Sequence, residues 1–439
     1  MADWAALSAS DLGRGIEAGK IDPVELTDFF LDRAGASDAI YARLTPDHAR
    51  AAAKAARARA QGGQRHGLLD GVPISWKDLF DLAGVVTEAG SALLAGRVPN
   101  TTAEVYLRAD AVGLVCLGKT HMTELAFSGL GVNPVTATPP NRHGAELAPG
   151  GSSSGAAVSV ALGLAPAAIG SDTGGSVRLP AAWNDLVGLK TTAGRLPLDG
   201  VVPLAPSFDT VGPLTKTVED AARIFAVLDK AQPSQATPDA MAPKMRFLVL
   251  DPYASDVREA PGQAFEWALS RLSDAGATIE TGRVKAAEYA MELTGQLYPT
   301  EAYGTWKNVI EAAPEKMFAQ ILERFRGGAN VSAPDYVAAR QALARYQAEF
   351  AEATADYDAV LLPTSPNQPP EVARLLQDDD YYVTENLLTL RNTRVGNLMG
   401  GCGLTIPTGV PSCGLLMMGR PWGEEDLLRI GTAVEAALS

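Results

Sequence analysis

The sequence has few of the residues on which many protein chemistries depend. Its 439 residues include only three cysteines and four histidines. Cys116, Cys402 and Cys413 cannot all pair with one another, and none of them lies in a C-x-x-C motif. Proteins stabilised by disulfides in oxidising compartments usually carry an even and denser set of cysteines. We therefore expect a protein of the reducing cytoplasm.

Basic charge is also scarce. Lys and Arg number 37 against 51 Asp and Glu, and the net charge is −14. Direct binding of nucleic acid or of an anionic membrane requires a basic surface, so both functions are disfavoured. The N-terminus has no early Lys or Arg and does not resemble a signal peptide. The most apolar long stretch, residues 156–170, is interrupted by Ser159, Gly163 and Pro166 and is too short to cross a bilayer.

The order of the hydrophobic segments predicts the fold class. With 46 % apolar and 20 % charged residues, the chain has enough apolar material for a large core. From residue 70 onward, short apolar runs alternate with helical patterns, which is typical of an α/β protein whose sheet is covered by helices. The predicted strands are residues 72–75, 114–117, 167–170, 247–250, 359–362, 404–406 and 415–418. The predicted helices are residues 158–164, 260–274, 335–353 and 424–438.

The first 60 residues are predicted to be helical. Asp22 precedes Pro23 and is the expected N-cap of a helix with proline at its first position. Thr45 precedes a second, Ala-rich helix over residues 46–61. Residues 233–243, rich in Pro, Ser and Gln, are predicted to form a surface connection.

The 43 glycines are clustered, and two of the clusters contain serines. The loop 149–155 reads P-G-G-S-S-S-G, and Ser176 follows Ser152 by 24 residues. A phosphate-binding loop would need a Lys directly after its last glycine, where this chain has Ala156. No nicotinamide, flavin or metal-ligand pattern is present either. We therefore expect no cofactor and no metal, and favour nucleophilic catalysis by a serine.

A serine nucleophile needs a base, and the histidines are poor candidates. His121 and His143 lie in no recognisable catalytic context, and Ser176 is not part of a G-x-S-x-G elbow. Lys77 ends the apolar run G-V-P-I-S-W, and burial of a lysine lowers its pKa and makes it a base. The alternative is that Lys77 forms an ion pair with Asp78 or Asp81.

Three separated motifs together resemble the amidase signature family. They are G-V-P-I-S-W-K-D around Lys77, the loop 149–155, and G-S-D-T-G-G-S-V-R-L-P over residues 170–180. The similarity extends from residue 69 to residue 220 and returns at residues 362–364 and 404–409. The family includes amidases and the A-type component of glutamyl-tRNA(Gln) amidotransferase.

The resemblance implies one α/β domain over residues 1–439, with a large mixed central sheet covered on both faces by helices. Its expected parts are an N-terminal helical region (1–65), a signature core (69–220), a variable and largely helical insert (240–355) and a C-terminal part that completes the sheet (356–439).

The resemblance also implies a Ser–Ser–Lys triad. Ser176 would attack the amide carbonyl, Ser152 would follow a cis peptide bond and bridge the triad, and neutral Lys77 would act as the base. Backbone N–H groups of Thr173, Gly174, Gly175 and Ser176 would form an oxyanion hole. We expect the flanking residues Asp172 and Arg178 to brace this turn rather than to touch substrate.

The substrate pocket is less well defined by the sequence. In the family, the region of Phe127, Ser128 and Gly129 borders the acyl pocket. Arg391 and Arg394 either hold a substrate carboxylate or neutralise the acidic surface, and the sequence leaves both open. Tyr298, Tyr303 and Trp306 have helical spacing, which favours packing in the core over a role in the pocket.

The resulting functional hypothesis is an amidase. It would hydrolyse a non-peptide carbon–nitrogen bond of a small amide to a carboxylate and ammonia or an amine, through an acyl-enzyme on Ser176. The alternative is an amidotransferase A-type subunit that generates ammonia from glutamine within a complex. Partner subunits and a homodimer both remain open.

Overall fold

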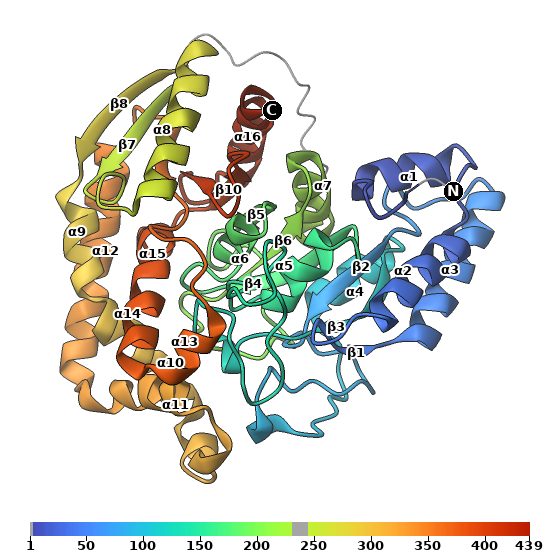
Figure 1. The fold of residues 1–439 in the computed structure, drawn as a ribbon, viewed down its shortest axis with the longest axis horizontal. Helices are drawn as coiled ribbons and strands as arrows, with labels where there is room; N and C mark the ends of the chain where they lie inside the picture. The colour runs from blue at the N-terminus through green and yellow to red at the C-terminus, as the bar shows by residue number, and fades with distance from the viewer. Residues whose placement is uncertain (1–2, 231–244) are drawn as a thin grey trace.

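A single eleven-stranded mixed sheet runs through the computed structural model, which describes residues 3–230 and 245–439 (Figure 1). The strand order is β1-β3-β2-β4-β6-β5-β10-β11-β9-β7-β8. The strands are β1 (Tyr41–Leu44), β2 (Pro73–Lys77), β3 (Val115–Thr120), β4 (Ala167–Asp172), β5 (Val187–Lys190), β6 (Thr210–Thr215), β7 (Arg246–Asp251), β8 (Thr278–Arg283), β9 (Ala359–Pro363), β10 (Gly403–Pro407) and β11 (Gly414–Met418).

Helices α2 and α3 lie at the β1 end of this sheet, and α8, α9 and α12 lie at the β8 end (Figure 1). The α-helices are α1 (Ala9–Glu17), α2 (Pro23–Gly35), α3 (Pro46–Gln61), α4 (Glu104–Ala111), α5 (Ser154–Ala161), α6 (Arg178–Trp183), α7 (Val218–Asp229), α8 (Glu259–Asp274), α9 (Lys285–Glu292), α10 (Thr294–Ile310), α11 (Ala319–Arg326), α12 (Ala333–Ala353), α13 (Val372–Gln377), α14 (Asp379–Thr389), α15 (Arg391–Leu398) and α16 (Glu424–Leu438). Short 3₁₀ helices are η1 (Ala92–Leu94), η2 (Glu124–Ala126), η3 (Pro314–Lys316) and η4 (Gly327–Asn330). No helix in the described part of the chain is both long and apolar enough to cross a membrane.

The predicted α/β class is confirmed, and each of the seven predicted strands lies in or overlaps a strand of the sheet. The side chain of Asp22 accepts hydrogen bonds from the N–H groups of Val24 and Glu25, as expected of the N-cap of α2. The Ala-rich helix is α3, with the predicted bounds. The predicted connection over residues 233–243 lies outside the described residues.

Four strands were not predicted from the sequence. β1 interrupts the N-terminal region that we expected to be helical, and it pairs with β3 at the edge of the sheet. β5 has only four residues, and β6 contains Gly212 and Pro213, which obscure its strand pattern. β8 lies at the other edge with no fully buried residue, so it lacks the apolar run of an interior strand.

The centre of the sheet is buried on both faces. Along β4, Ala167 and Ile169 belong to the same core cluster as α7, whereas Ala168 packs in a second cluster with α5. This alternation follows from the two-residue period of a strand. Helices therefore exclude water from both faces of β4, and polar groups at the end of this strand lie in a low-dielectric environment.

The neighbours of β4 determine which side chains meet at its end. β2 pairs with β4 in parallel, with Ser75 opposite Ala168 and Trp76 opposite Ile169. Lys77, the last residue of β2, therefore lies near Ser171 and Asp172 at the end of β4. Parallel strands end at the same edge of a sheet, and two segments separated by more than 90 residues are thus brought together.

Candidate active site

Lys77 lies at the end of β2 with its side chain fully buried. Its Nζ atom donates hydrogen bonds to the Oγ atoms of Ser152 and Ser171, both at 2.7 Å. Burial disfavours the charged form and lowers the pKa of Lys77 to about 7, against the opposing effect of the Asp172 and Asp209 carboxylates. A substantial share of this lysine is thus a neutral amine at neutral pH, as a general base requires.

The alternative role of Lys77 as an ion-pair partner is not observed. Asp78 pairs with Lys119 at 3.0 Å, and Asp81 pairs with Arg97 at 2.6 Å. The polar contacts of Lys77 are made with hydroxyl groups instead. The Nε2 atom of His143 lies 2.7 Å from the carboxylate of Asp185.

Ser152 lies in the glycine-rich loop directly before α5, and the Gly151–Ser152 peptide bond is cis, as the family resemblance implied. The loop is held by its backbone: the N–H of Gly151 donates to the carbonyl of Gly129 at 2.7 Å. A Cβ atom at Gly151 would lie 2.6 Å from the backbone nitrogen of Gly131. Only glycine permits this close approach of two backbones.

Ser176 lies in the turn between β4 and α6 and is buried. Its carbonyl accepts a hydrogen bond from the N–H of Ser153 at 3.2 Å, so this turn and the Ser152 loop lie side by side. The structure therefore brings Lys77, Ser152 and Ser176 together at one end of β2 and β4, as the family resemblance implies.

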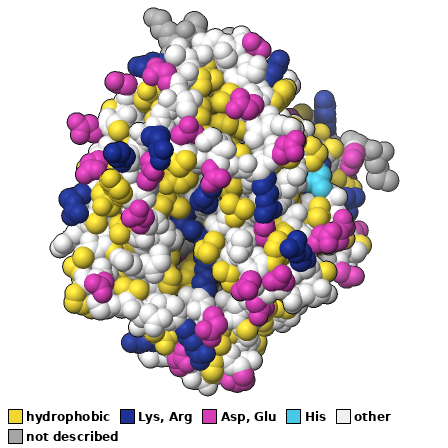
Figure 2. All heavy atoms as spheres, turned by 60° about the vertical axis from the view of Figure 1, so that its left-hand side comes forward, with side chains coloured by type: hydrophobic (Ala, Val, Ile, Leu, Met, Phe, Trp, Pro, Cys, Tyr) yellow, Lys and Arg dark blue, Asp and Glu magenta, His cyan; other side chains and the backbone are white. Residues whose placement is uncertain are grey.

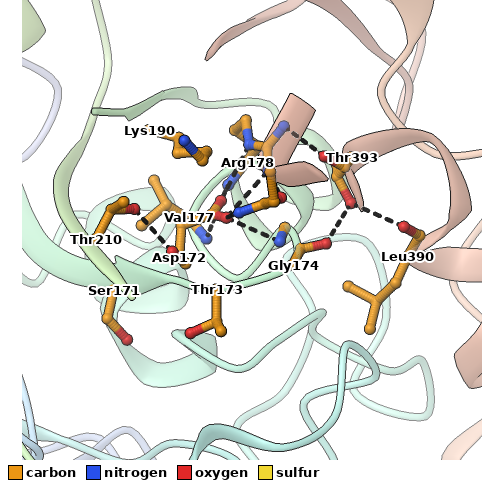
Figure 3. A network of polar contacts seen from close by, with 12 residues as sticks. Ser171, Asp172, Thr173, Gly174, Val177, Arg178, Lys190, Thr210, Leu390 and Thr393 are labelled. Carbon is orange, nitrogen blue, oxygen red and sulfur yellow. Dashed lines mark hydrogen bonds and ion pairs between the residues drawn. The ribbon is translucent and has the colours of Figure 1, made fainter. Parts of the chain in front are cut away.

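Asp172 and Arg178 hold the turn from within (Figure 3). Both side chains are fully buried and they pair through two hydrogen bonds of 3.0 Å. Asp172 also accepts from the N–H groups of Gly175 and Val177, at 2.8 and 3.1 Å. These contacts confirm the expectation that the pair braces the turn, and the positive charges around Asp172 hold its pKa well below the ordinary value.

Helix α15 completes this network from the other end of the chain. Asn397 donates to Asp172 at 2.9 Å, and Arg178 donates to the carbonyl of Thr393 at 2.8 Å. The hydroxyl of Thr393 donates to the carbonyl of Gly174 at 2.8 Å (Figure 3). The turn is therefore fixed by side chains on both sides before any substrate binds.

The predicted oxyanion hole has one donor that is already engaged. The N–H of Gly175 points to Asp172, whereas within the described chain no protein group accepts from the N–H groups of Thr173, Gly174 and Ser176. Gly175 has φ +135°, and a Cβ atom there would lie 2.1 Å from the Thr393 hydroxyl. Gly175 is required for the shape of the turn, and the other three N–H groups are available to an anion.

The predicted pocket residues Phe127, Ser128 and Gly129 contact side chains of helices α11 and α14. Ser128 accepts a hydrogen bond from the Tyr382 hydroxyl at 2.9 Å and donates to Asn386 at 3.0 Å, and Asn386 also accepts from the N–H of Gly129. Phe127 stacks edge-on against Phe325. Tyr382 and Asn386 in turn line a cavity of about 860 Å³, whereas the segment 127–129 contacts these two side chains without lining the cavity itself.

The residues that the sequence left undecided divide between the core, the surface and this cavity. Arg391, Arg394 and Tyr298 line the cavity. Tyr298 is thus both buried and part of a pocket wall, where core packing was favoured. Trp306 is core, with its Nε1 donating to the carbonyl of Pro203, and the Tyr303 hydroxyl donates to Glu311.

Sequence reasoning missed Ser171, Thr393 and Asn397. Ser171 belongs to the G-S-D-T-G-G-S motif, and the period of a strand places its side chain on the face that Lys77 reaches. Thr393 and Asn397 carry no local signal, since their role depends on α15 packing against a turn more than 200 residues earlier in the chain.

Comparison with known sequences identifies the family. The amidase family model matches residues 25–428. The chain is 36 % identical over 405 residues to 2-amino-5-chloromuconic acid deaminase of Comamonas testosteroni, covering 89 % of this chain and 86 % of the relative. It is 32 % identical over 481 residues to the A-type component of glutamyl-tRNA(Gln) amidotransferase from Anaeromyxobacter sp. (strain K), covering 98 % and 96 %.

Solved structures agree with this assignment. A crystal structure of an amidase matches with a TM-score of 0.88 at 29 % identity, covering 99 % of this chain and 100 % of the other. The native peptide amidase of Stenotrophomonas maltophilia matches with a TM-score of 0.80 at 27 % identity, covering 99 % and 97 %. The chain belongs to the amidase signature family. It is an amidase, a hydrolase that acts on carbon–nitrogen bonds.

Proposed function

We propose that Ser176 is the nucleophile of this amidase, with Ser152 and Lys77 as its proton relay. The observation that carries the proposal is the 2.7 Å contact between Lys77 Nζ and Ser152 Oγ in a fully buried environment. In the neutral state of Lys77, the Nζ lone pair accepts the Ser152 proton, and Ser152 in turn accepts the proton of Ser176. Ser176 Oγ then forms a bond to the carbonyl carbon of the amide.

The negative charge that develops on the carbonyl oxygen is placed opposite the N–H groups of Thr173, Gly174 and Ser176, which are the free donors of the turn. Each such donor typically contributes about 3 kcal/mol to the stability of the transition state. Protonated Lys77 returns its proton through Ser152 to the leaving nitrogen, and the carbon–nitrogen bond breaks with release of ammonia or an amine. Water then hydrolyses the acyl ester on Ser176 and the carboxylate product leaves.

Two variants and one label test this proposal. Ser176→Ala is expected to abolish ammonia release while its circular dichroism and melting temperature stay close to those of the wild type. A fluorophosphonate is expected to add its mass to the peptide that contains Ser176. Labelling of another serine, or turnover by Ser176→Ala at near wild-type rate, would falsify the assignment. Ser159→Ala is the matched control, because it also removes a buried serine hydroxyl, one that is hydrogen-bonded to the hydroxyl of Ser75.

The substrate remains to be found by an ammonia-release screen over aryl, aliphatic, ureido and glutamine-type amides. The Comamonas relative is named for deamination of 2-amino-5-chloromuconic acid, so that compound belongs in the screen. A second candidate function, the amidotransferase A-type subunit, is favoured by the 32 % identity over 98 % of this chain. This second function predicts that glutamine is the only amide of the screen that releases ammonia, and that the release requires added partner proteins.

We place the enzyme in the cytoplasm, because its three cysteines are all buried and unpaired. A homodimer is the simplest assembly to test. Light scattering on the purified protein distinguishes the 45.9 kDa chain from a particle of twice that mass.

A further inference from the structure

A cavity of about 860 Å³ is built by helices α9, α10, α11, α14 and α15. Its volume falls within the range of roughly 300–1,000 Å³ that small-molecule sites occupy. Figure 2 shows a hollow near the middle of the face that these helices form, with basic and apolar side chains on its walls. The apolar walls are formed by Met291, Pro299, Val383, Leu387 and Leu388.

Arg394 enters the cavity from α15 without a counterion. Its side chain is 5 % exposed, and its Nη2 atom has no hydrogen-bond partner in the described structure. Burial lowers its pKa, and the one group that opposes this effect is the phenol of Tyr298. A buried cation with unused donors is costly unless a partner of opposite charge occupies the space in front of it.

Arg324 brings a second guanidinium to the same cavity from α11. Its Cζ atom lies 4.5 Å from the centre of the Phe127 ring, and it forms no ion pair with any acidic side chain of the described residues. Burial and the nearby positive charge of Arg394 lower the pKa of Arg324 to about 9. Two positive charges therefore face one cavity, and an anion bound there would stabilise the charged form of both arginines.

The acidic residues of the cavity wall do not supply that anion. Glu323 is 72 % exposed and contacts Arg326 at 3.5 Å, and Asp379 accepts a hydrogen bond from Gln320. The third arginine of the wall, Arg391, is already paired with Asp256 at 2.6 Å. Arg324 and Arg394 thus differ from Arg391 in having their charge available to a ligand.

Tyr298 adds a neutral donor. Its hydroxyl is buried and has no hydrogen-bond partner within the described chain. Burial raises the pKa of this phenol, so the hydroxyl keeps its proton at neutral pH. The cavity thus combines two guanidinium groups and one hydroxyl, all of them donors, with walls of apolar side chains.

Two sets of contacts connect residues of the cavity wall to the loops that contain the proposed catalytic serines. Arg394 directly follows Thr393, whose hydroxyl donates to the carbonyl of Gly174 in the oxyanion turn. Arg324 lies over Phe127, and Tyr382 and Asn386 bond to Ser128 in the segment that precedes the Ser152 loop. A ligand held here can extend toward Ser176.

We propose that Arg324, Arg394 and Tyr298 bind a carboxylate of the substrate, so that this enzyme acts on amides whose carbon skeleton also carries a carboxylate. The inference rests on the proposed function for the position of the reacting amide. A carboxylate has two acceptor oxygens that match the fork of a guanidinium, and the apolar walls accommodate the carbon chain that links it to the amide.

A binding measurement tests this site independently of turnover. Calorimetry is expected to detect binding of adipate to the wild-type protein, weakened by added salt, and no binding of hexanamide at the same concentration. Arg394→Met and Arg324→Met are each expected to weaken adipate binding by about 10- to 100-fold, the range for loss of a charge-assisted hydrogen bond. Arg391→Met, the matched control on the same wall, is expected to change it less than about threefold.

The two arginine variants should remain folded, since Arg394 is a buried charge and Arg324 a half-buried one, and neither has a counterion among the described residues. The melting temperature of Arg394→Met should equal or exceed that of the wild type. The proposal is overturned if the wild type does not bind adipate at millimolar concentrations, or if Arg391→Met weakens binding as much as the other two variants.

A turnover measurement separates this inference from the proposed chemistry. The matched substrates are hexanamide and the monoamide of adipic acid, which carries a carboxylate. The kcat/KM of the monoamide is expected to exceed that of hexanamide by at least about tenfold, and Arg394→Met is expected to remove this preference. Equal turnover of both substrates with complete dependence on Ser176 would overturn the carboxylate site and leave the catalytic assignment standing. If the enzyme prefers the monoamide of adipic acid and Ser176→Ala keeps its activity, the carboxylate site stands and the catalytic assignment is overturned.

Discussion

The Nζ atom of Lys77 lies 2.7 Å from the Oγ atom of Ser152, and both side chains are completely shielded from solvent. In water, an ammonium group is stabilised by hydration that no hydroxyl can replace in full. The contact therefore joins an amine whose charged form is disfavoured by burial to the hydroxyl group from which, in the proposed mechanism, the neutral amine takes a proton.

The pH dependence of the reaction follows from this contact. Lys77 has a pKa of about 7 and must be neutral to accept a proton, so kcat/KM is expected to rise about tenfold per pH unit below that value and to level off above it. Measurement of kcat/KM across the acidic and neutral range checks this, with a buffer of constant ionic strength. A profile without an acidic limb contradicts Lys77 as the base.

Ser171→Ala is expected to lower kcat by about tenfold with little change in KM. The variant removes one of the two hydroxyls that accept from Lys77 Nζ and leaves a buried N–H without a partner. Because the lost hydrogen bond favours the charged amine, the acidic limb of the pH profile should also move to lower pH. This displacement identifies Ser171 as a positioning residue of Lys77. If kcat falls while the limb stays in place, the loss is merely structural.

Asp172→Asn is expected to destabilise the protein by about 3 kcal/mol or more, because it leaves Arg178 buried without a countercharge. The pKa of Asp172 lies far below its ordinary value of 3.8, so the pair is charged and this loss is fully present throughout the neutral range. Urea or thermal unfolding at neutral pH measures it. Asp256→Asn removes an exposed partner of Arg391 and should cost no more than about 0.5 kcal/mol.

The two glycines of the turn should respond differently to alanine. Gly175→Ala forces a Cβ into the Thr393 hydroxyl at a backbone conformation that alanine rarely adopts, and we expect a strongly destabilised, inactive protein. At Gly174 a Cβ meets no atom within 4 Å, so Gly174→Ala should keep a melting temperature near that of the wild type. Similar melting temperatures for the two variants would show that the turn does not require glycine at 175.

Much of the fold could be predicted because interior strands carry continuous apolar runs. β9 and β11 are buried at every residue and were predicted within one residue of their bounds. β8 has no fully buried residue and was missed, since an edge strand exposes one of its sides and needs no such run. Helix α5 begins four residues before its predicted start, because the serine and glycine residues at its beginning lack an apolar pattern.

The residues of the proposed site could be named in part from the sequence. Lys77, Ser152 and Ser176 occur in motifs whose order and spacing are specific, so each could be named from the sequence. The charge state of Lys77 and the free guanidinium groups of Arg324 and Arg394 depend first on burial and then on which charged side chains lie nearby in space. The separation of two residues along the sequence does not show whether they are neighbours in space. The sequence therefore left open whether Arg394 holds a substrate carboxylate or neutralises the acidic surface.

The contacts of α15 with the oxyanion turn have a consequence for the biogenesis of the enzyme. Asn397 and Asp172 are 225 residues apart, and Thr393 and Gly174 are 219 apart. A ribosome-bound chain that ends before α15 contains the three motifs around Lys77, Ser152 and Ser176 and still lacks the side chains of α15 that fix the turn. Contacts between such distant segments form late in folding. We therefore expect a translation product truncated before α15 to carry Lys77, Ser152 and Ser176 without the contacts that fix the turn, and to have no hydrolytic activity.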